Sequence, residues 1–566
     1  MNEQTGKRIE GDETSAVPPA SGKGQGRAWQ HFANLLILVL VCLALLGPGI
    51  SSLPLTDRDE ALYVQASHQM LETGNWVDIR FQDEPRYKKP AGIYWIQATA
   101  AELSGYGKDA PLWVYRLPSL FGAVLLVLFT YGIAATLGTA RAGLFAGLLA
   151  ASTMLIGFEA HIAKTDAVLC ATVLTAEFAL ARAYVDPTRT RSLPRNVLFW
   201  TAMGVGILIK GPITPLIAGL TLIVVSARER STALWRSLSP WKGILWMLLL
   251  VLPWLIAIGW ISGGAFFSQA VGHDMLGKVA SGQESHGAPP GVHLLVALGT
   301  FWPLSVLAPL AIVQAWKARR EPAIFFLIAW IVPGWLVFEA VATKLPNYVL
   351  PFMPALAILV ALLLDSGALG TARRGWRVSV AFIAIGAVLV GFGLNIAFLI
   401  YQGYVSWQGL VGAVAVACVG FAASRLLASG RLLPGLAATV ASAGGLMLLG
   451  YGVLLPAAQQ LWLSDDLATA VASVRRCDAP AVSVVGYGEP SAVFRLGTNT
   501  LRTTAPVAGE AFRSNDCAVA IVAAEAKDEF TAALGAGEKP PEPITTVSGR
   551  NLNGLKLRTM LLFVKP

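Results

Sequence analysis

Residues 32–50 of the chain have the sequence FANLLILVLVCLALLGPGI, and residues 51–60, SSLPLTDRDE, follow directly. A helix of about 20 mainly apolar residues crosses the hydrocarbon core of a bilayer. The run follows a long polar region and precedes no A-x-A-like cleavage site, so it is not expected to be a cleaved signal peptide. The apolar run therefore predicts a first spanning helix, which is followed by a charged segment at one membrane face.

The composition extends this prediction to most of the chain. Of the 566 residues, 55% are hydrophobic and 14% are charged, whereas soluble domains carry roughly 25% charged residues. We predict an all-α membrane domain over residues 32–460, preceded by a disordered cytoplasmic tail over 1–31. Gly and Pro near 211–212 and 289–290 leave open a broken helix in place of a loop. About 13 spans are expected to start near residues 32, 112, 140, 166, 196, 212, 241, 291, 322, 347, 376, 406 and 431.

The basic residues indicate an orientation. The net charge of +9 comes largely from alternate short loops, as the positive-inside rule requires of cytoplasmic loops. This predicts a multi-pass inner-membrane protein with a cytoplasmic N-terminus and, for an odd number of spans, a periplasmic C-terminus. It also argues against nucleic acid as a partner. The basic residues of these loops are Arg141, Arg182, Arg189, Arg191, Arg195, Arg228, Arg230, Arg236, Lys242, Lys317, Arg319, Arg320, Arg373, Arg374, Arg377, Arg425 and Arg431.

A small periplasmic α/β domain is predicted over residues 461–566. Residues 465–476 suit an amphipathic helix, 481–486 and 518–523 suit buried strands, and an alternating pattern follows the turn signal Asn553-Gly554. Cys477 and Cys517 lie in this domain, where an oxidising periplasm permits a disulfide. The sequence leaves a disulfide and two free thiols equally open.

The first outside loop, 51–111, is the most polar part of the membrane domain. It contains Asp57-Arg58-Asp59-Glu60 and the basic stretch Arg86-Tyr87-Lys88-Lys89-Pro90. Amphipathic segments over 61–71 and 91–103 suit helices that lie along the interface. A carboxylate here can deprotonate a hydroxyl or hold a metal, and adjacent cations can neutralise a phosphate. The same charges also fit a solvated acidic turn beside a lipid-headgroup patch.

Further ionisable residues stand near the predicted outer ends of spans, where charge is costly and often functional. Lys164 and Asp166 suit a site or a structural ion pair. Lys210 and Lys344 suit phosphate binding or snorkelling to the interface. The loop before the eighth span suits either a site or a flexible solvated segment, and contains His273, Asp274, Lys278, Glu284 and His286.

In order along the chain, these motifs resemble the bacterial aminoarabinose transferases, which modify lipid A and are related to the protein O-mannosyltransferases. The matching stretches run from about residue 55 to 355. They are Asp59-Glu60-Ala61-Leu62-Tyr63, Met70 to Trp76, Arg86 to Pro90, Tyr94-Trp95, Arg116-Leu117-Pro118-Ser119, Thr165-Asp166, Lys210-Gly211-Pro212 and Lys344 to Pro351.

The resemblance implies a type C glycosyltransferase fold and transfer of a sugar from a polyprenyl phosphate to a lipid or protein acceptor on the outer side of the membrane, and we expect a lipid or glycan acceptor as partner. By motif position, Asp59 is the catalytic base, Glu60 completes its acidic pair and Asp166 is a second site acid. The residues implied in donor-phosphate or substrate binding are Arg58, Tyr87, Lys88, Lys89, Lys210, Lys344 and Tyr348. No cofactor is certain, and a divalent metal at Asp59, Asp166 or His273 stays open.

One position departs from the pattern. Lys88 stands where the aminoarabinose transferases usually carry Glu before the lysine. Without that acid, an amino sugar loses an expected negative contact, and a hexose or a uronic acid becomes as plausible a substrate. A protein O-glycosyltransferase, a lipid or solute transporter and a non-catalytic assembly protein are the alternatives. A transporter predicts repeated halves, of which the sequence shows none.

Overall fold

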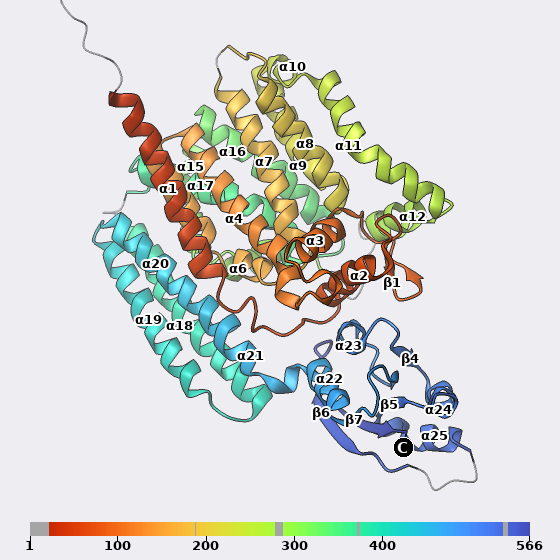
Figure 1. Ribbon diagram of the computed structural model, residues 1–566. Coiled ribbons are helices and arrows are strands. Elements are labelled where there is room, and N and C mark those ends of the chain that lie inside the picture. The colour runs from red at the N-terminus through yellow and green to blue at the C-terminus, as the bar shows by residue number, and fades with distance from the viewer. Residues whose placement is uncertain (1–21, 187, 278–286, 371–373, 536–540, 566) are drawn as a thin grey trace, which may run out of the picture.

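The computed structural model describes residues 22–186, 188–277, 287–370, 374–535 and 541–565. Within these ranges, nine helices are long and apolar enough to cross a membrane, or ten if one bent pair forms a single span. Figure 1 shows them as a bundle with a smaller domain at the C-terminus. The nine are α1 (Gly22–Leu46), α4 (Leu112–Leu137), α7 (Asp166–Val185), α11 (Pro240–Ile261), α16 (Pro322–Ala340), η4 with α17 (Pro346–Phe352, Met353–Asp365), α18 (Arg374–Gln402), α19 (Trp407–Ala428) and α20 with η5 and α21 (Leu432–Met447, Leu448–Leu454, Leu455–Ala457).

The predicted count of thirteen spans is not confirmed, although a helix lies near every predicted start. The bent pair is α5 (Ala140–Ala151) and α6 (Met154–Ala160), which meet at 66°. Next come α8 (Leu193–Lys210), which carries charge at both ends, and α9 (Ile213–Glu229), which has only 17 residues. The span predicted near residue 291 is two short helices, α14 (Val292–Thr300) and α15 (Ala308–Lys317).

The first helix starts earlier than its apolar run. It begins at Gly22, ahead of the predicted start at residue 32, so the predicted tail is helical over 22–31, and 1–21 lie outside the described residues. Polar residues continue the helix beyond the apolar segment. His31 Nδ1 lies 2.6 Å from the Tyr131 hydroxyl, and Asn34 donates to the Ala140 carbonyl at 3.2 Å. These contacts attach the start of α1 to α4 and α5.

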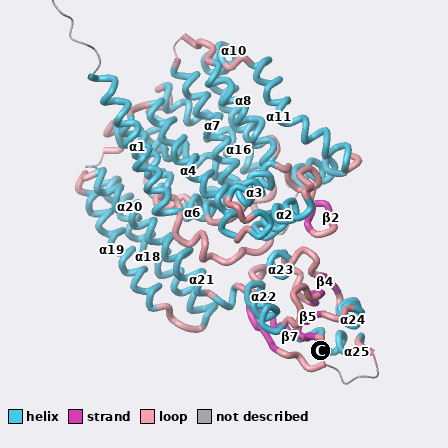
Figure 2. The backbone as a smooth tube through the Cα atoms, viewed as in Figure 1, coloured by secondary structure: helices cyan, strands magenta, loops and turns pink. Residues whose placement is uncertain are grey.

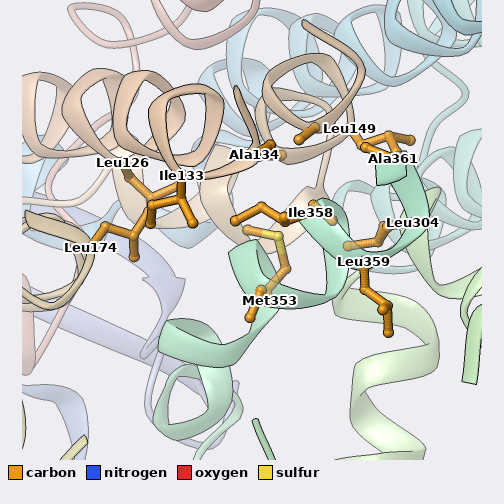
Figure 3. Close-up of a cluster of buried hydrophobic side chains, with 14 of the residues drawn as sticks. Leu126, Ile133, Ala134, Leu149, Leu174, Leu304, Met353, Ile358, Leu359 and Ala361 are labelled. Carbon is orange, nitrogen blue, oxygen red and sulfur yellow. The ribbon is translucent and has the colours of Figure 1, made fainter. Parts of the chain in front are cut away.

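The bundle core forms where α4, α5, α7 and α17 pack together. Figure 3 shows Leu126 and Ile133 from α4 and Leu174 from α7 on one side of this core, with Met353 and Ile358 of α17 facing them. Gly122 allows α4 to cross α7 closely, because a Cβ there would lie 2.9 Å from the Ala167 carbonyl carbon. This crossing fixes the start of α7, where Asp166 lies.

The first loop folds into the two predicted helices, α2 (Asp59–Thr73) and α3 (Gly92–Leu103). Between them lies a short hairpin of β1 (Arg80–Phe81) and β2 (Glu84–Pro85). A Cβ at Gly92 would lie 2.6 Å from the Leu208 carbonyl oxygen, so α3 packs closely on α8. The short connecting elements elsewhere are η1 (Gly107–Asp109), α10 (Ala233–Ser237), α12 (Ala265–Phe267), the π-helical η2 (Ser268–Leu276), η3 (Leu304–Val306) and η6 (Gln459–Leu461).

The C-terminal domain is a five-stranded mixed sheet in the order β4-β3-β5-β7-β6. Strands β3 and β5 match the predicted buried strands, and β6 pairs with β7 across the predicted turn. Cys477 and Cys517 form a disulfide, which resolves the alternative left open by the sequence. The elements are α22 (Leu463–Val474), β3 (Ala481–Val485), α23 (Pro490–Leu496), β4 (Leu501–Thr503), α24 (Ala505–Ser514), β5 (Ala518–Ala523), η7 (Ala524–Ala526), α25 (Lys527–Ala533), β6 (Thr545–Arg550) and β7 (Leu557–Val564).

This domain docks on the first loop. Figures 1 and 2 show α23 facing α2, and the two helices are in contact. Gln65 of α2 donates to the Thr498 hydroxyl at 2.8 Å, and Gln82 donates to the carbonyls of Thr498 and Thr500 at 2.9 and 2.7 Å. The Ser491 N–H donates to Asp57 at 3.2 Å. The sheet is thereby fixed beside the loop that carries the predicted active-site residues.

Candidate active site

A cavity of about 820 Å³ opens between the first loop, the ends of the spanning helices and the C-terminal domain. Asp59, Lys89, Asp166, Lys210 and Tyr348 all line it, although they come from separate parts of the chain. Its wall combines apolar side chains with six cations and four carboxylates. These charged residues are Arg58, Arg86, Lys88, Lys89, Lys164 and Lys210, and Asp59, Asp166, Asp274 and Glu489.

Asp59 is the first residue of α2, where the helix N-terminus favours a negative side chain. Its side chain is exposed to the cavity and makes no hydrogen bond or ion pair with any residue that the structure describes. The preceding Arg58 has φ 61° and ψ −96°, a strained conformation for a non-glycine residue. The backbone therefore turns sharply here and presents Arg58 and Asp59 together on the cavity wall.

Glu60, by contrast, lies away from the cavity wall and is fully buried. Arg116 of α4 donates to both of its carboxylate oxygens, at 2.7 and 2.9 Å, and the N–H of Ala163 donates to it at 2.9 Å. Burial raises the pKa of Glu60, but Arg116 and these hydrogen bonds outweigh burial and hold the pKa below its ordinary value. Glu60 thus anchors α2, and its geometry differs from the catalytic position that its motif implies.

Arg116 extends this anchor to the loop before α2. Its Nη1 donates to the carbonyl of Ile50 at 3.0 Å, and its Nη2 donates to the carbonyl of Pro54 at 2.9 Å. The guanidinium is wholly inaccessible to solvent. The chain leaving α1 is therefore held against α4 at the point where it turns into Asp59.

Asp166 occupies the helix side of the cavity. Lys210 and Asn347 donate to the same carboxylate oxygen at 2.6 and 2.7 Å, and Lys164 lies 3.7 Å from the other oxygen. The Lys210 ammonium lies 5.9 Å from the centre of the Tyr348 ring. Asp166 therefore holds two lysines beside the cavity, and its partners leave it poorly placed to accept a further proton.

The loop side carries the second group of cations. Lys89 forms an ion pair with Asp274 of η2, and Lys88 lines the cavity beside it. Arg86 donates to the Tyr94 hydroxyl at 3.0 Å, with its guanidinium 5.1 Å from the Tyr63 ring centre. Cations from two sides of the cavity can screen one phosphate between them.

Three predicted residues lie elsewhere. Lys344 is buried and donates to the carbonyls of Glu339, at 2.7 Å, and Val341, so it binds the end of α16 and not the cavity. Tyr87 donates to Asp78 at 2.8 Å; burial and this hydrogen bond raise its pKa to about 12. His273 lies on η2 beside the cavity-lining Asp274 but is not part of the wall.

No three His, Cys, Asp or Glu side chains gather at metal-binding spacing in the described parts of the chain, Asp59, Asp166 and His273 included. The alternatives that involve Lys278, Glu284 and His286 lie outside the described residues.

The structure adds wall residues that the predictions omitted. Arg86 and Asn347 stood inside quoted motifs, whereas Glu489 carried no sequence signal because it is distant from the loop in the chain.

The chain is similar to several known sugar transferases. The family described as dolichyl-phosphate-mannose-protein mannosyltransferase matches residues 88–257. Undecaprenyl phosphate-alpha-4-amino-4-deoxy-L-arabinose arabinosyl transferases of Pseudomonas fluorescens and Yersinia pestis are 28% and 27% identical to the chain, over 61% and 58% of its length. The chain spans 62% and 58% of the length of these two relatives.

The fold has a solved counterpart. ArnT from Cupriavidus metallidurans, in a crystal structure with bound undecaprenyl phosphate, matches with a TM-score of 0.71 at 22% identity, covering 95% of this chain and 98% of that one. The chain therefore has the fold of type C membrane glycosyltransferases. In sequence, it is similar to the aminoarabinose transferases and, over residues 88–257, to the dolichyl-phosphate-mannose-protein mannosyltransferase family.

Proposed function

We propose that this protein transfers a sugar from a polyprenyl phosphate to a lipid A, lipopolysaccharide or other envelope acceptor at the periplasmic face of the inner membrane. One observation carries the proposal: a single cavity combines Asp59, a carboxylate with no ion pair or hydrogen bond to any described residue, with cations from two sides. The names of the relatives, which are undecaprenyl-phosphate sugar transferases, support it.

The reaction is a single displacement at the anomeric carbon. The acceptor hydroxyl attacks that carbon, its proton passes to Asp59, and the bond to the phosphate oxygen breaks. Polyprenyl phosphate leaves with the electron pair. Lys89 and Lys210 neutralise the leaving phosphate, which stabilises the charge that develops in the transition state.

Asp166 and Asp274 act as positioning residues in this mechanism. Each pairs with a lysine on the cavity wall, Lys210 and Lys89 respectively, and fixes its ammonium group. Arg58 and Tyr348 complete the wall around the phosphate. The lipid tail lies along the apolar wall residues of α8, α11 and α16, such as Ile207, Leu255 and Phe338.

The proposed orientation places the N-terminus in the cytoplasm and the cavity and the C-terminal domain in the periplasm. The positive-inside rule supports it, because most short-loop arginines stand at the opposite end of the bundle from the cavity. The disulfide between Cys477 and Cys517 is also consistent with an oxidising compartment.

The test is reconstitution of the full chain in liposomes with undecaprenyl phosphate carrying an aminoarabinose, a hexose or a hexuronate. Transfer to lipid A or to total envelope lipid is followed by mass spectrometry. Lys88, in place of an acidic residue, favours the hexose or the hexuronate. If wild-type protein transfers none of these sugars to any envelope acceptor, including periplasmic protein, the proposed function is wrong.

A further inference from the structure

The four carboxylates on the cavity wall are of two kinds. Asp166 accepts hydrogen bonds from Lys210 and Asn347, and Asp274 pairs with Lys89. Asp59 and Glu489 make no ion pair and no side-chain hydrogen bond within the described ranges. The mechanism uses Asp59 as the base, so Glu489 is the one wall carboxylate without a partner among the described residues that it leaves unexplained.

Glu489 comes from the C-terminal domain, directly before α23. The residue is only 6% exposed, and its carboxylate oxygens are not fully enclosed. The remaining exposure is therefore toward the cavity, which Gly488 and Pro490 also line. Arg502 is close enough to interact electrostatically with Glu489 but forms no ion pair with it.

The docked interface holds Glu489 in this place. Ser491, two residues later, donates its N–H to Asp57 next to the Arg58-Asp59 turn. At the other end of α23, Thr498 donates to Glu72 at 2.7 Å and accepts from Gln65. Both ends of α23 are thus attached to the first loop, so the position of Glu489 relative to Asp59 is fixed by direct contacts.

A carboxylate removed from bulk water and given no protein donor is costly, and a ligand that supplies a donor removes that cost. A phosphate does not, because it carries the same charge, and the six wall cations already suit it. Carbohydrate hydroxyl and ammonium groups are the donors that the proposed substrates carry. Lys88 stands where the aminoarabinose transferases usually carry Glu, so another acidic side chain that can contact the sugar gains importance.

We infer that Glu489 forms a carbohydrate-binding subsite, contributed by the C-terminal domain, that accepts a hydrogen bond from a hydroxyl or ammonium group of the transferred sugar or of the acceptor. The inference rests on the proposed function. It makes the C-terminal domain part of the substrate site. Glu489 is a specificity-determining residue here, whereas Asp59 remains the base.

The experiment compares Glu489→Ala and Glu489→Gln with the control Glu510→Gln, an exposed carboxylate on α24 of the same domain. Full-length proteins are assayed in liposomes, and KM and kcat are measured separately for the polyprenyl-phosphate sugar and for the acceptor. A lost hydrogen bond to a charged group should raise one KM about 10- to 100-fold in Glu489→Ala. The control should match wild type.

The two KM values distinguish whether the ligand group belongs to the transferred sugar or to the acceptor. A raised donor KM assigns the subsite to the transferred sugar, and a raised acceptor KM assigns it to the acceptor; either result supports the inference. If the KM returns to the wild-type value in Glu489→Gln, the ligand group is a hydroxyl, because an amide oxygen still accepts a hydrogen bond. Equal loss in both variants indicates an ammonium group, which requires the charge.

Limited proteolysis of the domain junction checks that the sheet remains docked. The inference is overturned if both KM values stay at the wild-type level, if only kcat falls, or if the loss accompanies release of the domain. Each of these outcomes leaves the proposed function standing, because wild type still transfers sugar. Absence of transfer by wild type would instead remove the proposed function.

Discussion

The two ends of the helical bundle treat positive charge in opposite ways. At the cavity end, Arg116 and Lys164 are buried, and each pairs with a carboxylate, Glu60 and Glu159. At the opposite end, Arg228, Arg319 and Arg431 are exposed. Arg228 donates to the carbonyls of residues 319 and 320 there, at 2.9 and 2.8 Å, and its guanidinium lies 4.0 Å from the Phe325 ring centre.

This difference distinguishes two reasons why a membrane protein is rich in Lys and Arg. Exposed arginines such as Arg319 and Arg431 need no charged partner, because water solvates them, and they are sufficient to set orientation. Buried cations at the other end are expensive unless paired, so their presence indicates a site or an anchor. Counting charges along the sequence mixes these two causes, and the contacts of each residue separate them.

The largest effect is expected from Asp59→Asn. It removes the proposed base while keeping the shape of the side chain, so the transfer rate should fall about 10²- to 10⁴-fold with little change in donor binding. Asp83→Asn, an exposed carboxylate in the same loop, is the control and should keep full activity. Single-turnover transfer assays measure both. Wild-type rates in Asp59→Asn would assign the proton to another group.

A large loss of stability is expected from Arg116→Met. The change leaves Glu60 buried without its cation, which should destabilise the protein by about 3–5 kcal/mol. The matched control is Arg141→Met at the opposite end, because Arg141 is 59% exposed and lies 3.6 Å from Asp365. That exposed pair should contribute about 0–1 kcal/mol. Thermal unfolding in detergent compares the two, and equal losses would contradict the distinction between the ends.

The Glu60–Arg116 pair also shows what sequence patterns can and cannot predict. Helices α2 and α3 and strands β3, β5 and β7 follow from local periodicity, and Asp59, Lys89 and Lys210, which the motifs single out, line one cavity. The partner of Glu60, however, is 56 residues away. Adjacent carboxylates carry the same local signal, so the sequence offers no means of separating the exposed Asp59 from the buried anchor beside it.

The remaining errors have the same origin. Lys344 lies inside a matching motif, yet its ammonium group binds the carbonyls at the end of α16. The span predicted near residue 291 divides into α14 and α15, because hydropathy measures composition and does not detect a change in helix direction. Glu489 depends on how the C-terminal domain docks, and that contact involves residues more than four hundred positions apart.

The cavity lysines should affect ligand binding more than stability. Lys210→Met removes a cation from the proposed phosphate site, and the affinity for undecaprenyl phosphate should fall about 10- to 100-fold. Lys242→Met, an exposed lysine at the opposite end, should bind as wild type does. Microscale thermophoresis in detergent gives both affinities. Equal weakening in the two variants would indicate nonspecific attraction of the phosphate.

A smaller, pH-dependent effect is expected where the C-terminal domain meets the loop. Burial raises the pKa of Asp57 from its ordinary 3.8 to about 7; Glu489 and Asp465 act in the same direction, and Ser491 opposes them. Arg495 offsets the negative charge of Asp465, because the two side chains form an ion pair at 2.5 Å. Because the folded pKa is raised, the contribution of Asp57 to docking is complete below pH 3.8 and is lost as pH rises through about 7.

Amide hydrogen exchange of residues 491–496 measures this docking. Exchange should speed up between pH 5.5 and pH 8 in wild type, after correction for the intrinsic pH dependence of exchange. Asp57→Asn, which stays neutral, should lose that increase. An identical pH response in the two proteins would show that Asp57 does not titrate at the interface.

The smallest effect is expected from Arg431→Ala, at the start of α20. Its side chain is exposed, and no described residue forms an ion pair with it. Removal should change the free energy of unfolding by no more than about 0.5 kcal/mol and leave transfer unchanged, because water replaces every contact. Thermal unfolding and the transfer assay test this together. A loss comparable to that of Arg116→Met would mean that the exposed arginines also have structural partners, and the contrast between the two ends would then fail.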